Sequence, residues 1–217
     1  MKLITIDGPS ASGKGTVSQL VAKALGWEVL DSGALYRISA YAVQRDGIAL
    51  EDEQAVAAVV SHLAIQFKDG KVWVDGAAVD DILRQESTGK LASKIAAYPA
   101  LRQALFERQR AFLTDAGLVA DGRDMGTVIF PEAPLKIFLI ADVRERANRR
   151  YKQLLDKGLD ADFEAILADL QRRDEQDMNR AVAPLKPADD AVLIDSSHMG
   201  IQEVVDSILR EWEKKSH

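Results

Sequence analysis

The stretch Gly8-Pro9-Ser10-Ala11-Ser12-Gly13-Lys14-Gly15-Thr16 decides the fold. The apolar run 3–6 before it predicts a buried strand, and apolar residues at helical spacing predict a helix over 14–25 that ends at Gly26. A strand, a G-x-x-x-x-G-K loop and a helix in this order are typical of a site that binds nucleotide phosphates. The two glycines let backbone N–H groups surround phosphate oxygens, and Lys14 adds a charge that reaches the terminal phosphates. The alternative interpretation is a glycine-rich turn beside a surface lysine.

The residue after Lys14 departs from the usual pattern. Gly15 stands where most such loops have Ser or Thr, and the hydroxyl comes one position later, at Thr16. This weakens the case for a loop hydroxyl that ligates Mg²⁺ directly. The chain also lacks an Asn-Lys-x-Asp segment, which argues against a GTPase.

Alternating strands and helices follow the loop. The sequence predicts further short apolar strands at 27–30, 118–120, 135–141 and 191–194, and helices at about 34–46, 143–156, 163–179 and 200–214. Short apolar strands with helices between them indicate an α/β fold, a five-stranded parallel sheet with helices on both faces. Residues 64–79 break this rhythm because apolar and polar residues alternate around Asp69-Gly70 and Asp75-Gly76. We expect a small antiparallel β insertion there, followed by a helix over about 86–96.

Composition narrows the class of protein. The 217 residues carry a net charge of −6 and include no cysteine, and the three histidines show no metal-ligand spacing. We therefore expect one domain without disulfides, without a nucleic-acid partner and without membrane contact, located in the cytoplasm. A monomer is expected, because no long apolar stripe remains once the core is assigned.

Arginine and aspartate follow two of the predicted strands. Arg37 comes soon after the second strand, and Asp121, Arg123 and Asp124 follow the third. Ligands of open α/β sheets bind at the carboxyl ends of strands, and a phosphoryl acceptor needs permanently charged bidentate donors. Surface salt bridges between these residues are the alternative interpretation.

The two helices predicted at 143–156 and 163–179 are rich in arginine. Arg173, Asp177 and Arg180 have the spacing of one helix face, which could clamp a phosphate and a ribose. A solvated surface of ion pairs is the alternative, and it suits Arg146 and Arg172 best. Together the two helices suggest a helical lid that brings positive charge over the phosphates and excludes water.

Four segments together resemble the bacterial cytidylate kinase family: Gly8–Thr16, Asp31–Arg37, Ala120–Thr127 and Asn179–Leu185. The resemblance covers essentially the whole chain and implies the P-loop nucleoside monophosphate kinase fold. It implies ATP-dependent phosphorylation of CMP and dCMP, giving CDP or dCDP and ADP, with Mg²⁺ as cofactor and UMP as a poorer acceptor. It also implies a core of 1–58, 98–143 and 181–217, a monophosphate-binding insertion at about 59–97 and a lid at about 144–180.

The resemblance also assigns site residues. ATP would lie on Gly8–Thr16, and catalysis would rest on Lys14, Arg123 and Arg180. The acceptor phosphate would meet Ser32, Arg37, Arg123 and Arg180, and the cytosine would meet Ser93, Arg102 and Asp124. Asp177, oriented by Arg173, would hold the sugar hydroxyl with Tyr36 beside it, and Asp121 and Thr16 would hold Mg²⁺ through water. From fold geometry alone, the turn Asp195-Ser196-Ser197 is a candidate for adenine contacts.

Several points stay open. Relatives often have arginines where this chain has Gln176 and Met178, and Ser-Gly-Ala where it has Ser10-Ala11-Ser12. A phosphate-loop kinase for another acceptor, such as a different nucleoside monophosphate or shikimate, is one alternative. A non-catalytic nucleotide-binding regulator is another, although Lys14 and the lid arginines are present.

Overall fold

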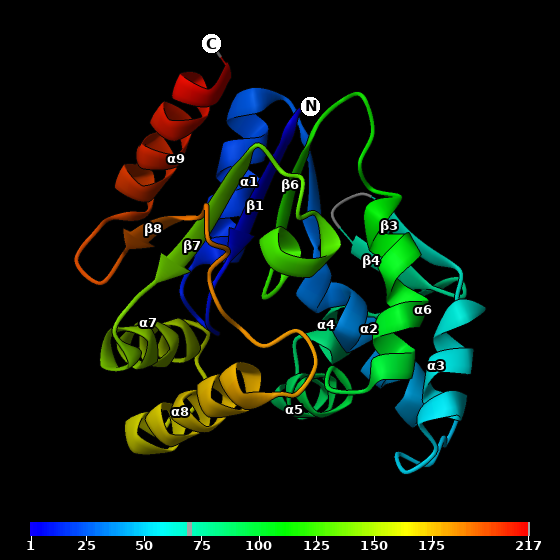
Figure 1. Cartoon of the computed structure of the whole chain (residues 1–217). Coiled ribbons are helices and arrows are strands. Elements are labelled where there is room, and N and C mark those ends of the chain that lie inside the picture. The colour runs from blue at the N-terminus through cyan, green and yellow to red at the C-terminus, as the bar shows by residue number, and fades with distance from the viewer. Residues whose placement is uncertain (69–70, 217) are drawn as a thin grey trace. The chain divides into compact units, whose positions relative to one another are not determined.

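Five short strands form a parallel sheet in the order β2-β6-β1-β7-β8 (Figure 1). The computed structural model describes residues 1–68 and 71–216. Leu3 of β1 pairs with Leu118 of β6, Ile4 pairs with Leu135 of β7, and Ile137 pairs with Val192 of β8. The predicted parallel sheet is confirmed, with strands β1 (Leu3–Asp7), β2 (Glu28–Asp31), β6 (Leu118–Gly122), β7 (Leu135–Ile140) and β8 (Val192–Asp195).

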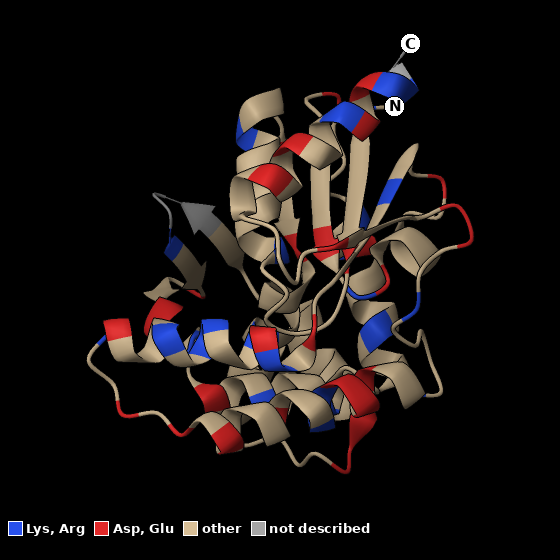
Figure 2. Ribbon diagram, turned by 90° about the vertical axis from the view of Figure 1, so that its left-hand side faces the viewer, with Lys and Arg blue, Asp and Glu red and all other residues tan. Residues whose placement is uncertain are grey.

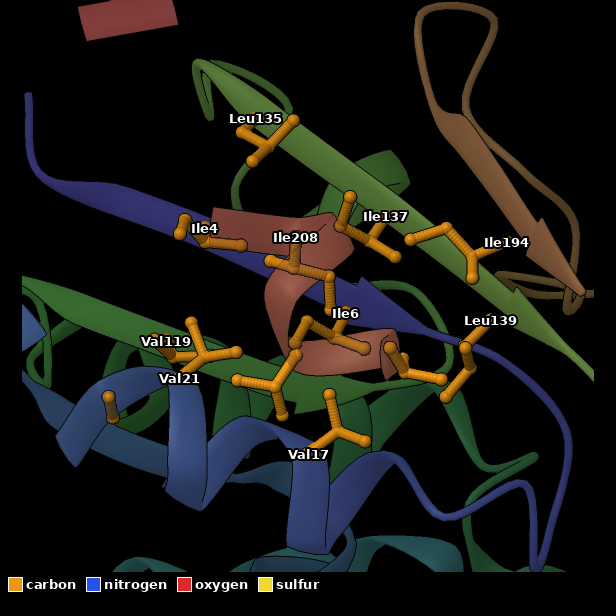
Figure 3. Close-up of a cluster of buried hydrophobic side chains, with 13 residues drawn as sticks. Ile4, Ile6, Val17, Val21, Val119, Leu135, Ile137, Leu139, Ile194 and Ile208 are labelled. Carbon is orange, nitrogen blue, oxygen red and sulfur yellow. The ribbon is translucent and has the colours of Figure 1, made fainter. Parts of the chain in front are cut away.

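Two helices cover one face of this sheet. Helix α1 (Lys14–Leu25) matches its predicted bounds and ends at Gly26, whose φ of 69° is left-handed. Helix α9 (Ile201–Ser216) packs beside it, and branched aliphatic side chains from both helices interlock with those of the strands (Figure 3). Trp27 meets Trp212 edge to face at a centroid distance of 4.9 Å. This apolar layer fixes the positions of the strands, and the polar residues of the site lie at the carboxyl ends of those strands.

On the opposite face of the sheet a short π-helix, η1 (Met125–Ile129), lies against β1 and β6, and the sequence did not predict it. A Cβ at Gly126 would lie 2.9 Å from the Thr5 hydroxyl of β1, so η1 sits directly on the strand. Helices α7 (Val143–Asp156) and α8 (Phe163–Asn179) match their predicted ranges and pack through Ala147, Leu167 and Leu170.

Residues 31–111 form a second compact unit, separate from the unit of 1–30 and 112–217. It contains an antiparallel sheet, β3 (Ile65–Lys68), β4 (Lys71–Val74) and β5 (Ala77–Ala78), and so confirms the predicted antiparallel insertion. Asp75 and Gly76, with φ values of 50° and 85°, make the predicted turn between β4 and β5. The predicted Asp69-Gly70 turn lies outside the described residues.

The helices of this second unit are only partly as predicted. Helix α2 (Ser32–Arg45) begins two residues earlier than expected because Asp31 caps it, accepting a hydrogen bond from Ala34 N. Helix α5 (Glu86–Ile95) matches the prediction, whereas α3 (Glu53–Ser61), α4 (Asp80–Leu83) and α6 (Pro99–Arg110) were not predicted. Within 1–68 and 71–216, no helix combines the length and apolar character needed to cross a membrane.

Candidate active site

The Gly8–Thr16 loop joins the end of β1 to the start of α1, as predicted. A Cβ on Gly8 would lie only 2.2 Å from the Leu139 carbonyl oxygen, so the loop leaves the sheet along a path open only to glycine. Gly13 caps α1 with a φ of 90°, which a side chain would strain. The glycines therefore lead the chain from the end of β1 directly to the N-terminal end of α1, whose positive dipole favours a bound anion.

Two buried polar side chains, Lys14 and Ser12, lie inside the loop. Lys14 is 7% exposed and its Nζ donates to the Pro9 carbonyl oxygen at 3.0 Å. The buried Ser12 hydroxyl has no hydrogen-bond partner among the described residues. Ala11 has a φ of 58°, a left-handed conformation that costs a non-glycine residue energy. An enclosed cation and a buried hydroxyl on a strained loop suit a bound phosphate.

Arg123 connects this loop to α8. Its Nη2 donates to Ser10 Oγ at 2.9 Å, and its Nε donates to Asp177 Oδ2 at 2.9 Å. Burial opposes its charge, yet the carboxylates of Asp177, Asp121 and Asp174 together raise the pKa of Arg123. The alternative of a local pair with Asp124 is wrong, because Arg123 turns to Asp177 instead.

Arg146 makes a second connection between the loop and α8, and here the sequence interpretation was wrong. It was expected on a solvated helix surface, but it is 4% exposed. Its Nη1 donates to the Ser10 carbonyl oxygen at 2.9 Å, its Nε donates to the Ala141 carbonyl oxygen, and both terminal nitrogens contact the Asp174 carboxylate. Buried charges persist only when paired in this way, and two of these partners, Ser10 and Asp174, lie far away in sequence.

Arg173 and Arg180 do not share one helix face as expected. Helix α8 ends at Asn179, so Arg180 lies in extended backbone, where its Nε donates to the Ala183 carbonyl oxygen. Its Nη2 lies 4.0 Å from Asp124 Oδ1. Arg173 lies 3.9 Å from Asp169, and burial together with the nearby Arg123 charge lowers the pKa of its guanidinium. Such crowding of cations is unfavourable unless an anion binds between them.

Asp121 and Thr16 are the two side chains near the loop that the resemblance assigns to Mg²⁺. Asp121 is buried at the end of β6, and its Oδ2 lies 3.3 Å from where a Cβ of Gly15 would be, so glycine at that position leaves room for the carboxylate. Thr16 is exposed. No group of three metal-ligating side chains occurs within the described part of the chain. One carboxylate and one hydroxyl suit Mg²⁺ bound mainly by phosphates and water, and they do not suit a cage of protein ligands.

Asp7 supports the segment that carries Arg123 and Asp124. Its two oxygens accept hydrogen bonds from Met125 N and Gly126 N, each at 2.8 Å. Burial, with a contribution from the charge of Asp124, raises the pKa of Asp7 to about 6. Figure 2 shows such acidic residues gathered at one end of the sheet strands, where the loop also begins.

The remaining predicted residues lie in the second unit. Ser32 and Tyr36 are buried one turn apart on α2, and the Arg102 guanidinium lies 5.9 Å from the centre of the Tyr36 ring. Arg37 donates to the Leu83 carbonyl oxygen at 2.7 Å, and a Cβ on Gly89 would come within 2.9 Å of its Nη2. Ser93 is half-buried on α5. The structure thus brings Ser32, Tyr36 and Arg102 together, with Arg37 held against α5.

Comparison with known proteins decides the family. A sequence model of the cytidylate kinase family matches residues 4–214. The chain belongs to the cytidylate kinase family. The cytidylate kinase of Pseudomonas aeruginosa (strain LESB58) is 54% identical over 219 residues, which cover 98% of this chain and 96% of the relative. That of Bordetella bronchiseptica is 56% identical over 210 residues, covering 97% and 94%, and that of Saccharophagus degradans is 58% identical over 212 residues, covering 95% of each.

Membership in the cytidylate kinase family makes the chain an enzyme, a nucleoside monophosphate kinase. The structure adds residues that the sequence analysis did not assign to the site: Asp7, Arg146, Asp174 and Gln109, which accepts a hydrogen bond from Ser32. All four are buried polar residues that contact a predicted site residue or its neighbour. In the sequence, each of the four could have been noticed as a polar residue at a position where the period of the helix or strand predicts an apolar one.

Proposed function

We propose that this member of the cytidylate kinase family transfers the γ-phosphoryl group of ATP to CMP and dCMP, giving ADP and CDP or dCDP. The observation that carries the proposal is the half-buried Arg123, whose guanidinium links Ser10 of the phosphate loop to Asp177. A permanently charged, bidentate donor beside a nucleotide loop suits a phosphoryl group in transfer. The family membership favours CMP as the acceptor.

Four side chains are assigned to the acceptor phosphate: Ser32, Arg37, Arg123 and Arg180. A phosphate monoester is a dianion whose oxygens accept hydrogen bonds, and each of these groups can donate. Arg37 supports the assignment because its Nη1 donates to the Leu83 carbonyl oxygen, which orients a permanently charged guanidinium on α2. In our proposal residues 59–97 form the monophosphate-binding insertion.

Three side chains are assigned to the base: Ser93, Arg102 and Asp124. Asp124 is 3% exposed, and an ionised carboxylate can only accept hydrogen bonds. The amino group of cytosine would donate to it, whereas uracil presents a carbonyl oxygen at the same position. A buried carboxylate that faces an acceptor loses its partner, so UMP should be the poorer substrate.

Asp177 and Tyr36 are assigned to the sugar. Asp177 is buried, and the resemblance implied that Arg173 orients it. In the structure Arg123 donates the hydrogen bond that orients it. A contact with the 3′-hydroxyl, which ribose and deoxyribose share, would allow both CMP and dCMP. Tyr36 would pack beside the ring.

Catalysis in this proposal needs no general base. An acceptor phosphate oxygen is already ionised near neutral pH, so it can attack the γ-phosphorus in line with the leaving ADP oxygen. Lys14, Arg123 and Arg180 would neutralise the charge that spreads over the transferred group. Mg²⁺, when bound near Asp121 and Thr16, would supply further charge neutralisation on the phosphates of ATP. Residues 144–180 would close as a lid and exclude water, which otherwise competes as acceptor.

A panel of acceptors tests the proposal. ADP release from ATP and Mg²⁺ would be measured with CMP, dCMP, UMP, shikimate and no acceptor. We expect rapid release with CMP and dCMP, weaker release with UMP, and almost none otherwise. Equal release with every acceptor, or none with CMP, would contradict the proposal. We also infer a monomer, since one chain carries all the assigned residues, and light scattering would test this.

A further inference from the structure

The hydroxyl of Ser32 has a defined partner in the second unit. Its Oγ donates to Gln109 Oε1 at 2.6 Å, across 77 positions of sequence. Ser32 is 3% exposed and Gln109 is 1% exposed. A hydroxyl has one proton, and in this structure that proton is directed at the amide of Gln109.

Gln109 is held in place from its own helix. It lies in the last turn of α6, and its Nε2 donates to the Leu105 carbonyl oxygen at 3.3 Å. A buried amide costs free energy unless its hydrogen bonds are made, and a leucine or methionine would fill the same space without that cost. What the amide adds at this position is therefore its hydrogen bond to Ser32.

The same helix also carries Arg102, which is seven residues before Gln109 and lies on the same face. Arg102 is buried against the Tyr36 ring of α2, and Gln109 is buried against Ser32 of α2. Tyr36 and Ser32 are themselves one turn apart. Two contacts between these helices thus hold two predicted ligand-binding side chains of α2 in register with α6.

We propose that Gln109 is a positioning residue for the acceptor phosphate, acting through Ser32. This inference rests on the proposed function, in which Ser32 donates to the phosphate of CMP. Gln109 keeps the Ser32 side chain in one rotamer before the substrate arrives. When the phosphate accepts the hydrogen bond of the hydroxyl, a half-turn of the amide, which releases Nε2 from the Leu105 carbonyl oxygen, offers an N–H to Ser32 Oγ in exchange. Neither a carboxylate nor a thioether can make that exchange.

A double-mutant cycle tests the inference, using Gln109→Met, Ser32→Ala and the double variant. Gln103→Met serves as a matched control, because Gln103 is exposed on the same helix. One hydrogen bond corresponds to about a fivefold change, so Gln109→Met should raise the KM for CMP by about fivefold and leave the KM for ATP unchanged. In the Ser32→Ala background, Gln109→Met should change neither value further, and Gln103→Met should have no effect.

The outcomes separate the two levels of the proposal. A Gln109→Met effect of equal size with and without Ser32, an equal effect on ATP, or no effect would overturn the positioning role. An unchanged KM for CMP in Ser32→Ala would remove Ser32 from the phosphate site and the inference with it, whereas absent CMP-dependent turnover in the wild type would refute the proposed function itself.

A measurement on the unaltered protein covers the case in which Gln109→Met does not fold. The side-chain amide resonance of Gln109 should shift when CMP binds and should stay in place with cytidine, which lacks the phosphate. The same position with both ligands would overturn the inference.

Discussion

Replacing Asp7 with asparagine should change how the stability of the protein depends on pH. Asp7 is 4% exposed, and its carboxylate accepts the N–H groups of Met125 and Gly126 at the start of η1. Burial raises the pKa of Asp7 from 3.8 to about 6, and the nearby Asp124 charge adds to this, while the two N–H groups and Lys14 oppose it. The folded protein therefore binds the Asp7 proton more tightly than the unfolded chain does.

The difference between the two pKa values determines whether stability rises or falls with pH. Between pH 4 and 6 the folded state holds more protons at this position than the unfolded state, so the free energy of unfolding falls as pH rises. The pKa difference of about 6 − 3.8, or roughly 2.2, corresponds to about 3 kcal/mol at roughly 1.4 kcal/mol per unit. The ionised Asp7 thus lowers stability at neutral pH, in return for two short hydrogen bonds that hold the segment after Asp124.

Urea unfolding of the wild type and Asp7→Asn at pH values from 4 to 7.5 measures this effect. Asparagine does not titrate, so the stability of the wild type relative to the variant should fall by about 2–3 kcal/mol over that range. Asp190→Asn is a useful control, because the hydrogen bond from Lys136 lowers the pKa of Asp190 below 3.8, so the difference in stability between the wild type and this variant should stay nearly constant from pH 5 to 7.5. A wild-type-to-Asp7→Asn difference that stays constant with pH would refute the reasoning.

Three further variants test the site and the loop. Lys14→Ala should lower kcat by about 10³-fold in the ADP-release assay while the melting temperature changes little, because the side chain acts mainly on phosphate charge; near-normal turnover would contradict its role. Asp124→Asn should reduce the ratio of kcat/KM for CMP over UMP by about 10- to 100-fold, and an unchanged ratio would count against base recognition. Gly8→Ala should destabilise the fold by about 3 kcal/mol or more in urea unfolding, since its Cβ would meet the Leu139 carbonyl oxygen, whereas Gly47→Ala, whose Cβ meets nothing within 4 Å, should cost only about 1 kcal/mol. Equal losses for the two glycine variants would argue against the steric explanation.

Most of the parallel sheet could be predicted because its strands are short and mostly apolar. The runs 135–141 and 3–6 are too short for a typical helix and are next to residues that favour turns, so a buried strand is the structure that they predict. Helix α6 could not be predicted in the same way, because two of its buried positions are Arg102 and Gln109. A helix that buries polar residues shows a weak apolar period, and only its tertiary partners explain why it folds.

The site was predictable where function imposes a local pattern and was missed where it depends on distant partners. Gly8 and Gly13 stand in a spacing that the phosphate loop requires. The role of Arg146 depends on Ser10, 136 positions away, and on Asp174. No spacing rule reports such a contact, so the sequence favoured a solvated arginine.

Binding of a bisubstrate analogue, in which a pentaphosphate joins adenosine and cytidine, tests most directly whether the cations of this chain hold two phosphate groups at once. Calorimetry would compare its affinity with those of ATP and CMP alone. We expect the analogue to bind at least about 100-fold more tightly than either nucleotide, and to bind much more weakly to the Arg123→Met variant. An analogue that binds no more tightly than ATP would contradict it.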